Sequence, residues 1–214
     1  KWLVFDFGGG TFDAALVKVE DGILTVFDTE GDNYLGGKNL DEAVVNKILM
    51  PSLKEDYVLS SYETTEWKKK ALIDALKGPA EEMRIALSFA DSADYSTYDR
   101  NLNLGQDDNG EEIDLEITIT KDQLIDAVGE QYKKAVGICK KLLERNGLTG
   151  KDPSSLILVG GPTYSPIIRD MLKAEITPNV DTSINPMTAV ARGAALYAST
   201  IDANINEAEI KKEA

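Results

Sequence analysis

The sequence lacks histidine altogether and has a single cysteine in 214 residues. Without histidine, the chain cannot form a histidine-based catalytic triad, a histidine metal site or a histidine general base. The single thiol, Cys139, excludes an intramolecular disulfide and a cysteine cluster. Because Cys139 keeps helical spacing to Val136 and Leu143, we expect it to be a small core residue. Functions that depend on these groups are therefore excluded.

Basic residues and long apolar runs are also scarce. The chain carries 37 acidic and 23 basic residues and a net charge of −14, which argues against nucleic acid as the main partner because a phosphate backbone requires a basic face. An anionic nucleotide can still bind where backbone amides and a metal supply a local positive field. No apolar run approaches the roughly 20 residues of a membrane span, and no signal peptide is visible. We therefore expect no membrane partner and a cytoplasmic location.

The chain starts at Lys1, without methionine and directly before an apolar run. We therefore expect a piece of a longer polypeptide. Its length suits one large domain or two small ones, and its composition, 43% hydrophobic and 28% charged, is ordinary for a soluble globular protein.

The most informative stretch is KWLVFDFGGGTFDAAL, residues 1–16. Trp2–Phe5 predicts a buried strand, an apolar run resumes at Ala14, and the glycines between them form the tip of a hairpin. Consecutive glycines cost backbone entropy, which a chain accepts where φ is positive or where backbone approaches something closely. The bare N–H groups of such a tip bind anions, phosphate above all. These glycines, called here the first glycine turn, are Gly8, Gly9 and Gly10.

Two carboxylates, Asp6 and Asp13, flank the first glycine turn, and Thr11 follows it. Carboxylates beside a phosphate repel it unless a cation lies between them, so a hydrated Mg²⁺ is implied. The alternative is a plain glycine-rich β-turn. The two acidic residues and the threonine favour phosphate binding over that alternative.

Two further glycine pairs stand between regular elements. The second glycine turn, Gly36-Gly37, precedes a helix that Asn39 can cap and that Pro51 ends. The third glycine turn, Gly160-Gly161, follows a predicted strand at residues 155–159. Each pair exposes backbone where a ligand could come close. Neither a Walker A loop nor a GxGxxG segment is present.

Between the second and third glycine turns the sequence predicts helices, then a hairpin, then a long helix. Residues 64–90 predict a charged helical region broken at Gly78-Pro79. Residues 95–104 and 112–119 predict the two strands of a β-hairpin, the second with clean apolar alternation.

Helix-start signals organise the last half of the chain. Thr120 and Gln123 form a capping box that begins a long helix. Asn185-Pro186 predicts the start of a last helix, whose small residues suit close approach to a sheet. Residues 201–214 have no apolar stripe and predict a surface helix or a loose tail.

Four segments closely resemble motifs of the DnaK-type heat-shock 70 kDa chaperone family. FDFGGGTFD at 5–13 resembles the family's second phosphate motif, and GDNYLGGKNLD at 31–41 resembles its GDxxLGGxxFD segment. LILVGGPTYSPIIRDML at 156–172 is similar to its adenosine motif, and INPMTAVARGAAL at 184–196 to its NPDEAVAxGAA segment. The four motifs stand in the family's order and span nearly the whole chain.

The resemblance implies the second lobe of the family's nucleotide-binding domain. Its fold would be α/β (α+β), an actin-like ATPase lobe of ribonuclease H-like type with an inserted cap of helices and a β-hairpin. Residues 1–37 and 129–214 would form the core subdomain (IIA-like), and residues 38–128 the cap subdomain (IIB-like). On this resemblance, the first lobe and a peptide-binding domain would lie outside this sequence.

The motif positions imply roles for individual residues toward ATP or ADP and Mg²⁺. Asp6 would hold water around Mg²⁺, while the first glycine turn and Thr11 would bind the β- and γ-phosphates with Asp13 nearby; these three side chains would serve catalysis. The second glycine turn, Gly36 and Gly37, would approach the ribose and phosphates. The segment of the third glycine turn would lie against the nucleoside through Gly160, Gly161, Pro162 and Tyr164. Three residues on one helical face, which alone also fit a solvated charged face, would meet the adenosine: Glu81, Arg84 and Ser88.

The sequence departs from the family pattern at four positions. Ile85 stands where a basic residue usually covers adenine, and Tyr164 stands where an arginine usually lies on its other face. Pro162 replaces the serine of the adenosine motif, and Met187 the aspartate of the last motif. An aliphatic and an aromatic group thus replace the charged pair around the base, and a tyrosine face can stack on adenine.

The function implied by the resemblance is half of a chaperone motor domain. The full-length protein would couple ATP binding and hydrolysis to binding and release of unfolded polypeptides, and the chain alone would hydrolyse no ATP. Partners would be unfolded clients held by the missing peptide-binding domain, a J-domain co-chaperone and a nucleotide exchange factor. Two alternatives stay open: an actin- or MreB-type assembly ATPase, and a regulatory homologue that binds nucleotide without hydrolysing it.

Overall fold

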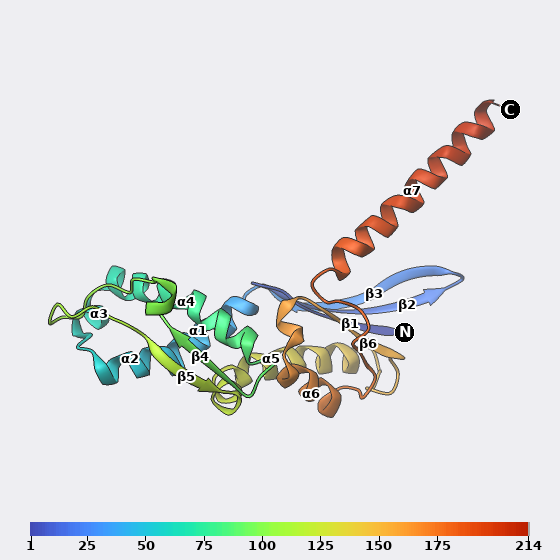
Figure 1. The fold of residues 1–214 in the computed structure, drawn as a ribbon. Coiled ribbons are helices and arrows are strands. Elements are labelled where there is room, and N and C mark those ends of the chain that lie inside the picture. The colour runs from blue at the N-terminus through green and yellow to red at the C-terminus, as the bar shows by residue number, and fades with distance from the viewer. Residues whose placement is uncertain (214) are drawn as a thin grey trace.

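The computed structural model describes residues 1–213, with side chains through residue 201. These residues form two parts that lie next to each other in Figure 1. One part is built on a five-stranded sheet, and the other contains helices and a two-stranded sheet.

The five-stranded sheet has the strand order β3-β2-β1-β6-β7. β1 and β2 form the predicted hairpin and β3 continues it antiparallel to β2, whereas β6 lies parallel to β1 and β7 parallel to β6. β1 extends beyond the predicted apolar run and includes Asp6, because pairing with β2 continues to the glycines. The bounds are β1 Trp2–Phe7, β2 Phe12–Glu20, β3 Ile23–Asp32, β6 Ser155–Val159 and β7 Val180–Asp181.

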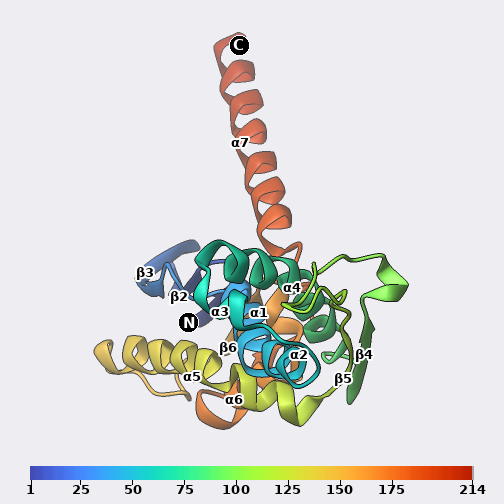
Figure 2. The same ribbon diagram turned by 90° about the vertical axis from the view of Figure 1, so that its left-hand side faces the viewer.

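One face of this sheet is packed and the other is open. Helices α5 and α6 lie along the packed face (Figures 1 and 2). Along β1, Phe5 and Phe7 are fully buried on this side, and burying each ring stabilises the fold by roughly 1.5–3 kcal/mol. The Tyr132 ring of α5 lies 5.7 Å from that of Phe7, centroid to centroid. Val4 and Asp6 point to the second face and stay half-buried, and among residues 1–213 no helix packs along that face.

The second part spans α1 to β5 and has its own antiparallel sheet of β4 and β5. Within the described residues, no strand of this part joins the five-stranded sheet. α5 begins here and continues across the packed face of the large sheet, so the expected boundary at 128/129 falls inside one helix. The bounds are α1 Gly37–Val44, the π-helical turn η1 Val45–Leu49, α2 Met50–Asp56, α3 Ser60–Thr64, α4 Glu66–Ala86, β4 Ser92–Ser96, the 3₁₀ turn η2 Tyr98–Arg100, β5 Glu116–Thr120 and α5 Lys121–Arg145.

Two prolines do not end helices as the sequence predicted. α4 runs unbroken through Pro79, which is itself buried together with Leu76 and Met83 on the same side of the helix. Packing of this apolar side outweighs the one backbone hydrogen bond that proline removes. Pro51 lies in the first turn of α2, directly after η1, and proline is tolerated at that position of a helix.

The predicted hairpin strands are too long, whereas the predicted capping box is correct. β4 and β5 are five residues each, much shorter than predicted, because the chain between them leaves the ladder and buries Leu104 and Ile113 individually. The capping box is confirmed: the Thr120 N–H donates to Oε1 of Gln123 at 2.9 Å, and the Thr120 hydroxyl accepts from the Gln123 N–H. Cys139 is fully buried, also as predicted.

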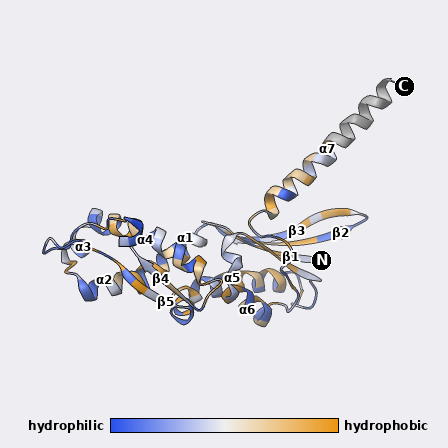
Figure 3. Cartoon of the chain, viewed as in Figure 1, coloured by the Kyte–Doolittle hydropathy of each residue, from blue (hydrophilic) through white to orange (hydrophobic). Residues whose placement is uncertain are grey.

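The chain closes with η3 (Gly161–Tyr164), α6 (Pro166–Glu175) and α7 (Ala189–Glu213). α7 starts later than predicted, because the Asn185 side chain accepts from the Met187 N–H at 2.9 Å and holds a turn there. The expected approach of α7 to the sheet is wrong: the helix extends away from the body, and every side chain from Ala191 to Ile201 is exposed (Figures 1 and 2). Figure 3 shows apolar residues on this exposed first half. The helix covers the predicted 201–214 segment except residue 214, which lies outside the described residues.

None of the helices described is long and apolar enough to span a membrane.

Candidate functional site

The first glycine turn joins β1 to β2 at the edge where β1 ends. Phe7 and Phe12 are the last paired residues, and the Gly8 N–H donates to the Thr11 carbonyl at 2.9 Å to close the turn. None of the three glycines has a positive φ. Positive φ therefore does not explain them, and a Cβ on Gly9 or Gly10 would meet nothing within 4 Å, so their lack of side chains leaves the backbone of the turn open. The glycine that close approach does require is Gly36, which packs against Gly10.

The backbone of the second glycine turn lies against that of the first. A Cβ added to Gly36 would lie 2.5 Å from Cα and N of Gly10, so no side chain fits between the two turns. The Gly37 N–H donates to the Gly8 carbonyl at 2.9 Å, and the Lys38 N–H to the Gly9 carbonyl at 2.8 Å. The start of α1 thus holds the carbonyl side of the first glycine turn.

The amide side of the first glycine turn is left for a ligand. Among the described residues, no hydrogen bond engages the N–H groups of Gly9 and Gly10, both of which are exposed. A Cβ on either glycine would meet nothing within 4 Å. Successive free amides of this kind attract anions. The N-terminal end of α1, which begins at Gly37, adds the partial positive charge of a helix start.

Asp6 and Asp13 face each other directly across β1 and β2 on the open face of the sheet. Burial first, and then the charge of Asp13, raise the pKa of Asp6. Like charges directly opposite on neighbouring strands are destabilising, and a cation between them would remove that repulsion. The described residues hold no group of three or more acidic residues that would suit a metal by themselves. A Mg²⁺ at this edge would therefore take most of its ligands from water and phosphate, which is how this ion is usually bound.

The third glycine turn lies at the same edge, since β6 runs parallel to β1. Gly160 has φ +90°, and a Cβ there would stand 2.0 Å from the Phe7 carbonyl oxygen. Only glycine fits both conditions. The predicted residues of the first, second and third glycine turns therefore come together at the carboxyl ends of β1 and β6, where ligands commonly bind in α/β sheets.

A pocket of about 300 Å³ lies beside the three turns and is called here the α4–η3 pocket. It contains all three residues expected on one face of α4 and most of those expected around the third glycine turn. Gly37 adjoins it: a Cβ there would lie 3.3 Å from Cγ of Pro162 and 3.7 Å from Nη2 of Arg84. The lining residues are Glu81, Arg84, Ile85, Ser88, Phe89, Gly161, Pro162, Tyr164 and Met187.

Arg84 is held by a partner that sequence reasoning missed. Its Nε donates to Oδ1 of Asp41 at 2.7 Å, and both side chains are nearly buried. Burial raises the pKa of Asp41, and the bond to Arg84 offsets part of that rise. The pair joins α4 to α1. Asp41 lies in the GDNYLGGKNLD motif, which was the available signal for it.

Phe89 also lines the α4–η3 pocket although it was not predicted as a site residue, and nothing in the sequence marks it as one. It follows the end of α4, is 76% exposed, and its ring centroid lies 6.4 Å from that of Tyr164. The Tyr164 hydroxyl donates to Oδ1 of Asn185 at 2.8 Å.

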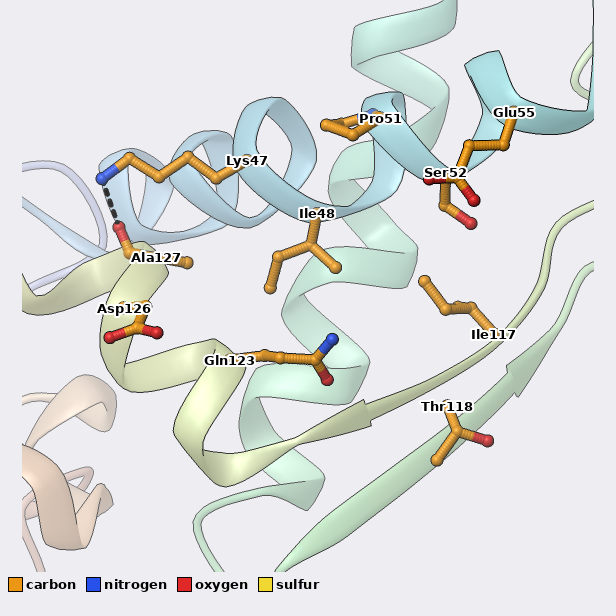
Figure 4. Close-up of a pocket in the computed structure, with 10 residues that line it drawn as sticks. All are labelled: Lys47, Ile48, Pro51, Ser52, Glu55, Ile117, Thr118, Gln123, Asp126 and Ala127. Carbon is orange, nitrogen blue, oxygen red and sulfur yellow. Dashed lines mark hydrogen bonds between the residues drawn. The ribbon is translucent and has the colours of Figure 1, made fainter.

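A larger cavity, of about 520 Å³, lies elsewhere and contains none of the predicted site residues. Figure 4 shows it between η1, α2, β5 and the start of α5, with Lys47 donating to the Ala127 carbonyl at its edge. It is an open groove with mixed charged and apolar lining. The three glycine turns and the α4–η3 pocket, not this groove, form the candidate site.

A model of the family described as Hsp70 protein matches residues 1–211. The chain belongs to the Hsp70 family. This Hsp70 chain is also similar to the chaperone protein DnaK of Nitrosopumilus maritimus (strain SCM1), with 30% identity over 208 residues. The match covers 96% of this chain and 31% of that relative, so the chain spans about a third of the relative's length.

Family membership confirms the resemblance inferred from the four motifs. The Hsp70 family binds nucleotide and has an actin-like ATPase fold, and the mixed five-stranded sheet with helices on one face agrees with that fold. The departures at Ile85, Pro162, Tyr164 and Met187 all lie in the α4–η3 pocket, away from the amides of the first glycine turn.

Proposed function

We propose that this chain is the nucleotide-binding lobe of an ATP-dependent chaperone that couples ATP binding and hydrolysis to the binding and release of unfolded polypeptides. The observation that carries the proposal is the junction of the first and second glycine turns. Their two hydrogen bonds hold the Gly9 and Gly10 amides outward beside Asp6, and Gly37 connects that place to the α4–η3 pocket.

A nucleotide that extends from the first glycine turn past Gly37 to the α4–η3 pocket would place its phosphates, ribose and base against different parts of the site. The β- and γ-phosphates would accept from the amides of the first glycine turn and from Thr11. The ribose would pass the bare backbone of Gly37, and the base would enter the α4–η3 pocket. A Mg²⁺ ion would neutralise phosphate charge, and Asp6 would orient water bound to it while Asp13 adds negative charge on the same side. Hydrolysis depends on such positioning and on charge stabilisation.

The wider assignments are also proposals. Residues 1–37 and 129–214 would be the core subdomain and 38–128 the cap. Clients would be held by a peptide-binding domain, and a J-domain co-chaperone and an exchange factor would act on the complete protein. The cytoplasmic location stays a prediction.

Titration of the 214-residue chain with Mg-ADP and Mg-ATP, by calorimetry or by NMR at millimolar nucleotide, tests the proposal. We expect binding that weakens strongly when Mg²⁺ is removed by chelation. Asp94→Asn serves as the control because it removes a carboxylate on β4, away from the glycine turns. This variant should bind as the unchanged chain does. Absence of binding to either nucleotide at millimolar concentration would overturn the proposal.

One observation favours a second candidate, a homologue that binds nucleotide without hydrolysing it. The base end of the site is apolar where the family pattern is charged, with Ile85 and Met187 exposed at the α4–η3 pocket. A single-turnover assay on a polypeptide that contains both lobes separates the two candidates, since only the first predicts phosphate release.

A further inference from the structure

Three large apolar side chains are exposed together around the α4–η3 pocket. Ile85, Phe89 and Met187 are 49%, 76% and 65% exposed, and all three line the same cavity as Tyr164. Single exposed apolar residues are ordinary on protein surfaces, but a cluster that borders a cavity indicates a ligand that covers it.

The rings of Phe89 and Tyr164 contact each other in this pocket. Their centroids are 6.4 Å apart, within the roughly 4.5–7 Å of an ordinary aromatic pair, so a planar base enters between them only when Phe89 moves away from Tyr164. The ring planes are inclined by 49°. Phe89 is mostly exposed, so its ring can turn parallel to a base without displacing any core residue.

Tyr164, by contrast, is held in place from several sides. Its hydroxyl donates to Asn185, and the guanidinium carbon of Arg169 lies 5.7 Å from the centre of its ring. Arg169 is itself fixed, since its Nε donates to the Thr163 carbonyl at 2.7 Å. The pocket therefore has one fixed ring and one movable ring.

We propose that Phe89 and Tyr164 form an aromatic clamp that holds the nucleobase of a bound nucleoside phosphate by stacking, with little selection among the purines. The clamp rests on the function proposed above, which places the phosphates on the first glycine turn and the base in this pocket. Phe89 is then a binding residue of the site.

The weak selection follows from the polar groups that remain in the pocket. Nε of Arg84 donates to Asp41, and the Ser88 hydroxyl donates to the Arg84 carbonyl at 3.3 Å. Glu81 is exposed at the rim, where its Oε1 lies 3.9 Å from Nη2 of Arg84. Stacking tolerates any base because every base has a π-face, whereas strong discrimination requires buried groups that pair with the base edge.

The test compares Mg-ADP, Mg-GDP and Mg-IDP binding to the 214-residue chain and its variants. We expect the three dissociation constants to agree within about tenfold. Phe89→Ala should weaken all three by a similar factor of roughly 5–150, the range for one stacked base, and should leave the binding of Mg-pyrophosphate unchanged. Tyr98→Ala, which removes an equally exposed ring away from the site, is the matched control and should change nothing.

Phe89→Trp gives a direct signal, because the indole should keep the affinity and its fluorescence should be quenched on nucleotide binding. Unchanged affinity in Phe89→Ala, or a preference for ADP over GDP above a hundredfold, would overturn the clamp and leave the proposed function standing. Failure of the unchanged chain to bind any of the nucleotides would overturn the proposed function and the clamp together.

Discussion

The contact between Gly36 and Gly10 makes Gly36→Ala the sharpest test of how the site is assembled. Gly36 is extended, with φ −165° and ψ −173°, so alanine meets no backbone strain there. Its methyl carbon, however, would lie 2.5 Å from N and Cα of Gly10 and 2.6 Å from its carbonyl carbon. Ordinary contacts between such atoms are about 3.5–4.0 Å, so the two turns must separate by roughly 1 Å.

The magnitude follows from the two hydrogen bonds at this junction. The Gly37 and Lys38 amides donate to the Gly8 and Gly9 carbonyls at 2.9 and 2.8 Å. A further 1 Å takes both beyond hydrogen-bond distance. Each contributes about 0.5–1.5 kcal/mol net, so Gly36→Ala should lower the free energy of unfolding by about 1–3 kcal/mol. The amides of the first glycine turn would also lose their orientation, and Mg-ADP binding should weaken with the stability.

Urea unfolding and calorimetric titration of the same preparations provide the assay, with Gly9→Ala as the matched control. A Cβ on Gly9 meets nothing within 4 Å, and its φ is not positive. Alanine at such a position stabilises by about 0.4–1 kcal/mol through the unfolded state. Its methyl group would nevertheless occupy the space proposed for phosphate, so this variant should be stable and bind poorly. Gly36→Ala with wild-type stability, or equal destabilisation by both variants, would refute the reasoning.

Three further predictions concern charge and catalysis. Burial and the charge of Asp13 raise the pKa of Asp6, so the stability that the protonated Asp6 contributes is present at low pH and is lost as pH rises through its folded-state pKa. Asp6→Asn should therefore stabilise the nucleotide-free chain by roughly 0.2–1 kcal/mol at pH 7. This gain should disappear when urea unfolding is repeated at acid pH. Arg84→Leu should cost about 3–5 kcal/mol because it leaves Asp41 buried without a partner, and adding Asp41→Leu should recover part of that loss in urea unfolding. The 214-residue chain should release no measurable phosphate from Mg-ATP, because Asp6 and the first glycine turn lie on an open face; turnover that Asp6→Asn abolishes would contradict this.

Local signals in the sequence predicted the parts of the fold whose causes are local. The hairpin of β1 and β2 follows from two apolar runs around a glycine turn, and the start of α5 follows from Thr120 and Gln123, whose reciprocal hydrogen bonds lie within four residues. The break at Pro79 was wrong because burial of one side of α4 decides that helix, and burial depends on partners distant in sequence. The course of α7 was wrong for the same reason, since small residues permit packing without specifying a partner.

In the candidate site too, residues marked by a local sequence signal were predicted, and contacts between residues distant in sequence were not. The glycines were predictable because a glycine cluster has few other physical causes, although none in the first turn has a positive φ, and close approach requires glycine at Gly36 and Gly160. Arg84 was predicted by its place in a family motif, but its pairing with Asp41 joins residues 43 apart in sequence. Phe89 was not predicted because an aromatic residue after a helix is usually a core residue. Its place in the candidate site is evident only from the structure, where its ring lies beside that of Tyr164.

The two ends of the site are specified by different kinds of atoms, and this explains how the chain can depart from its family at one end only. The proposed phosphate end is built mainly on backbone amides and carbonyls, positioned because Gly36 and Gly160 admit no Cβ. Side chains of the α4–η3 pocket can change without altering those glycines. The proposed base end consists of side chains, so Ile85 and Tyr164 would alter what it binds without disturbing the glycine turns. A chain built this way can keep the position of the phosphates while its preference among bases changes.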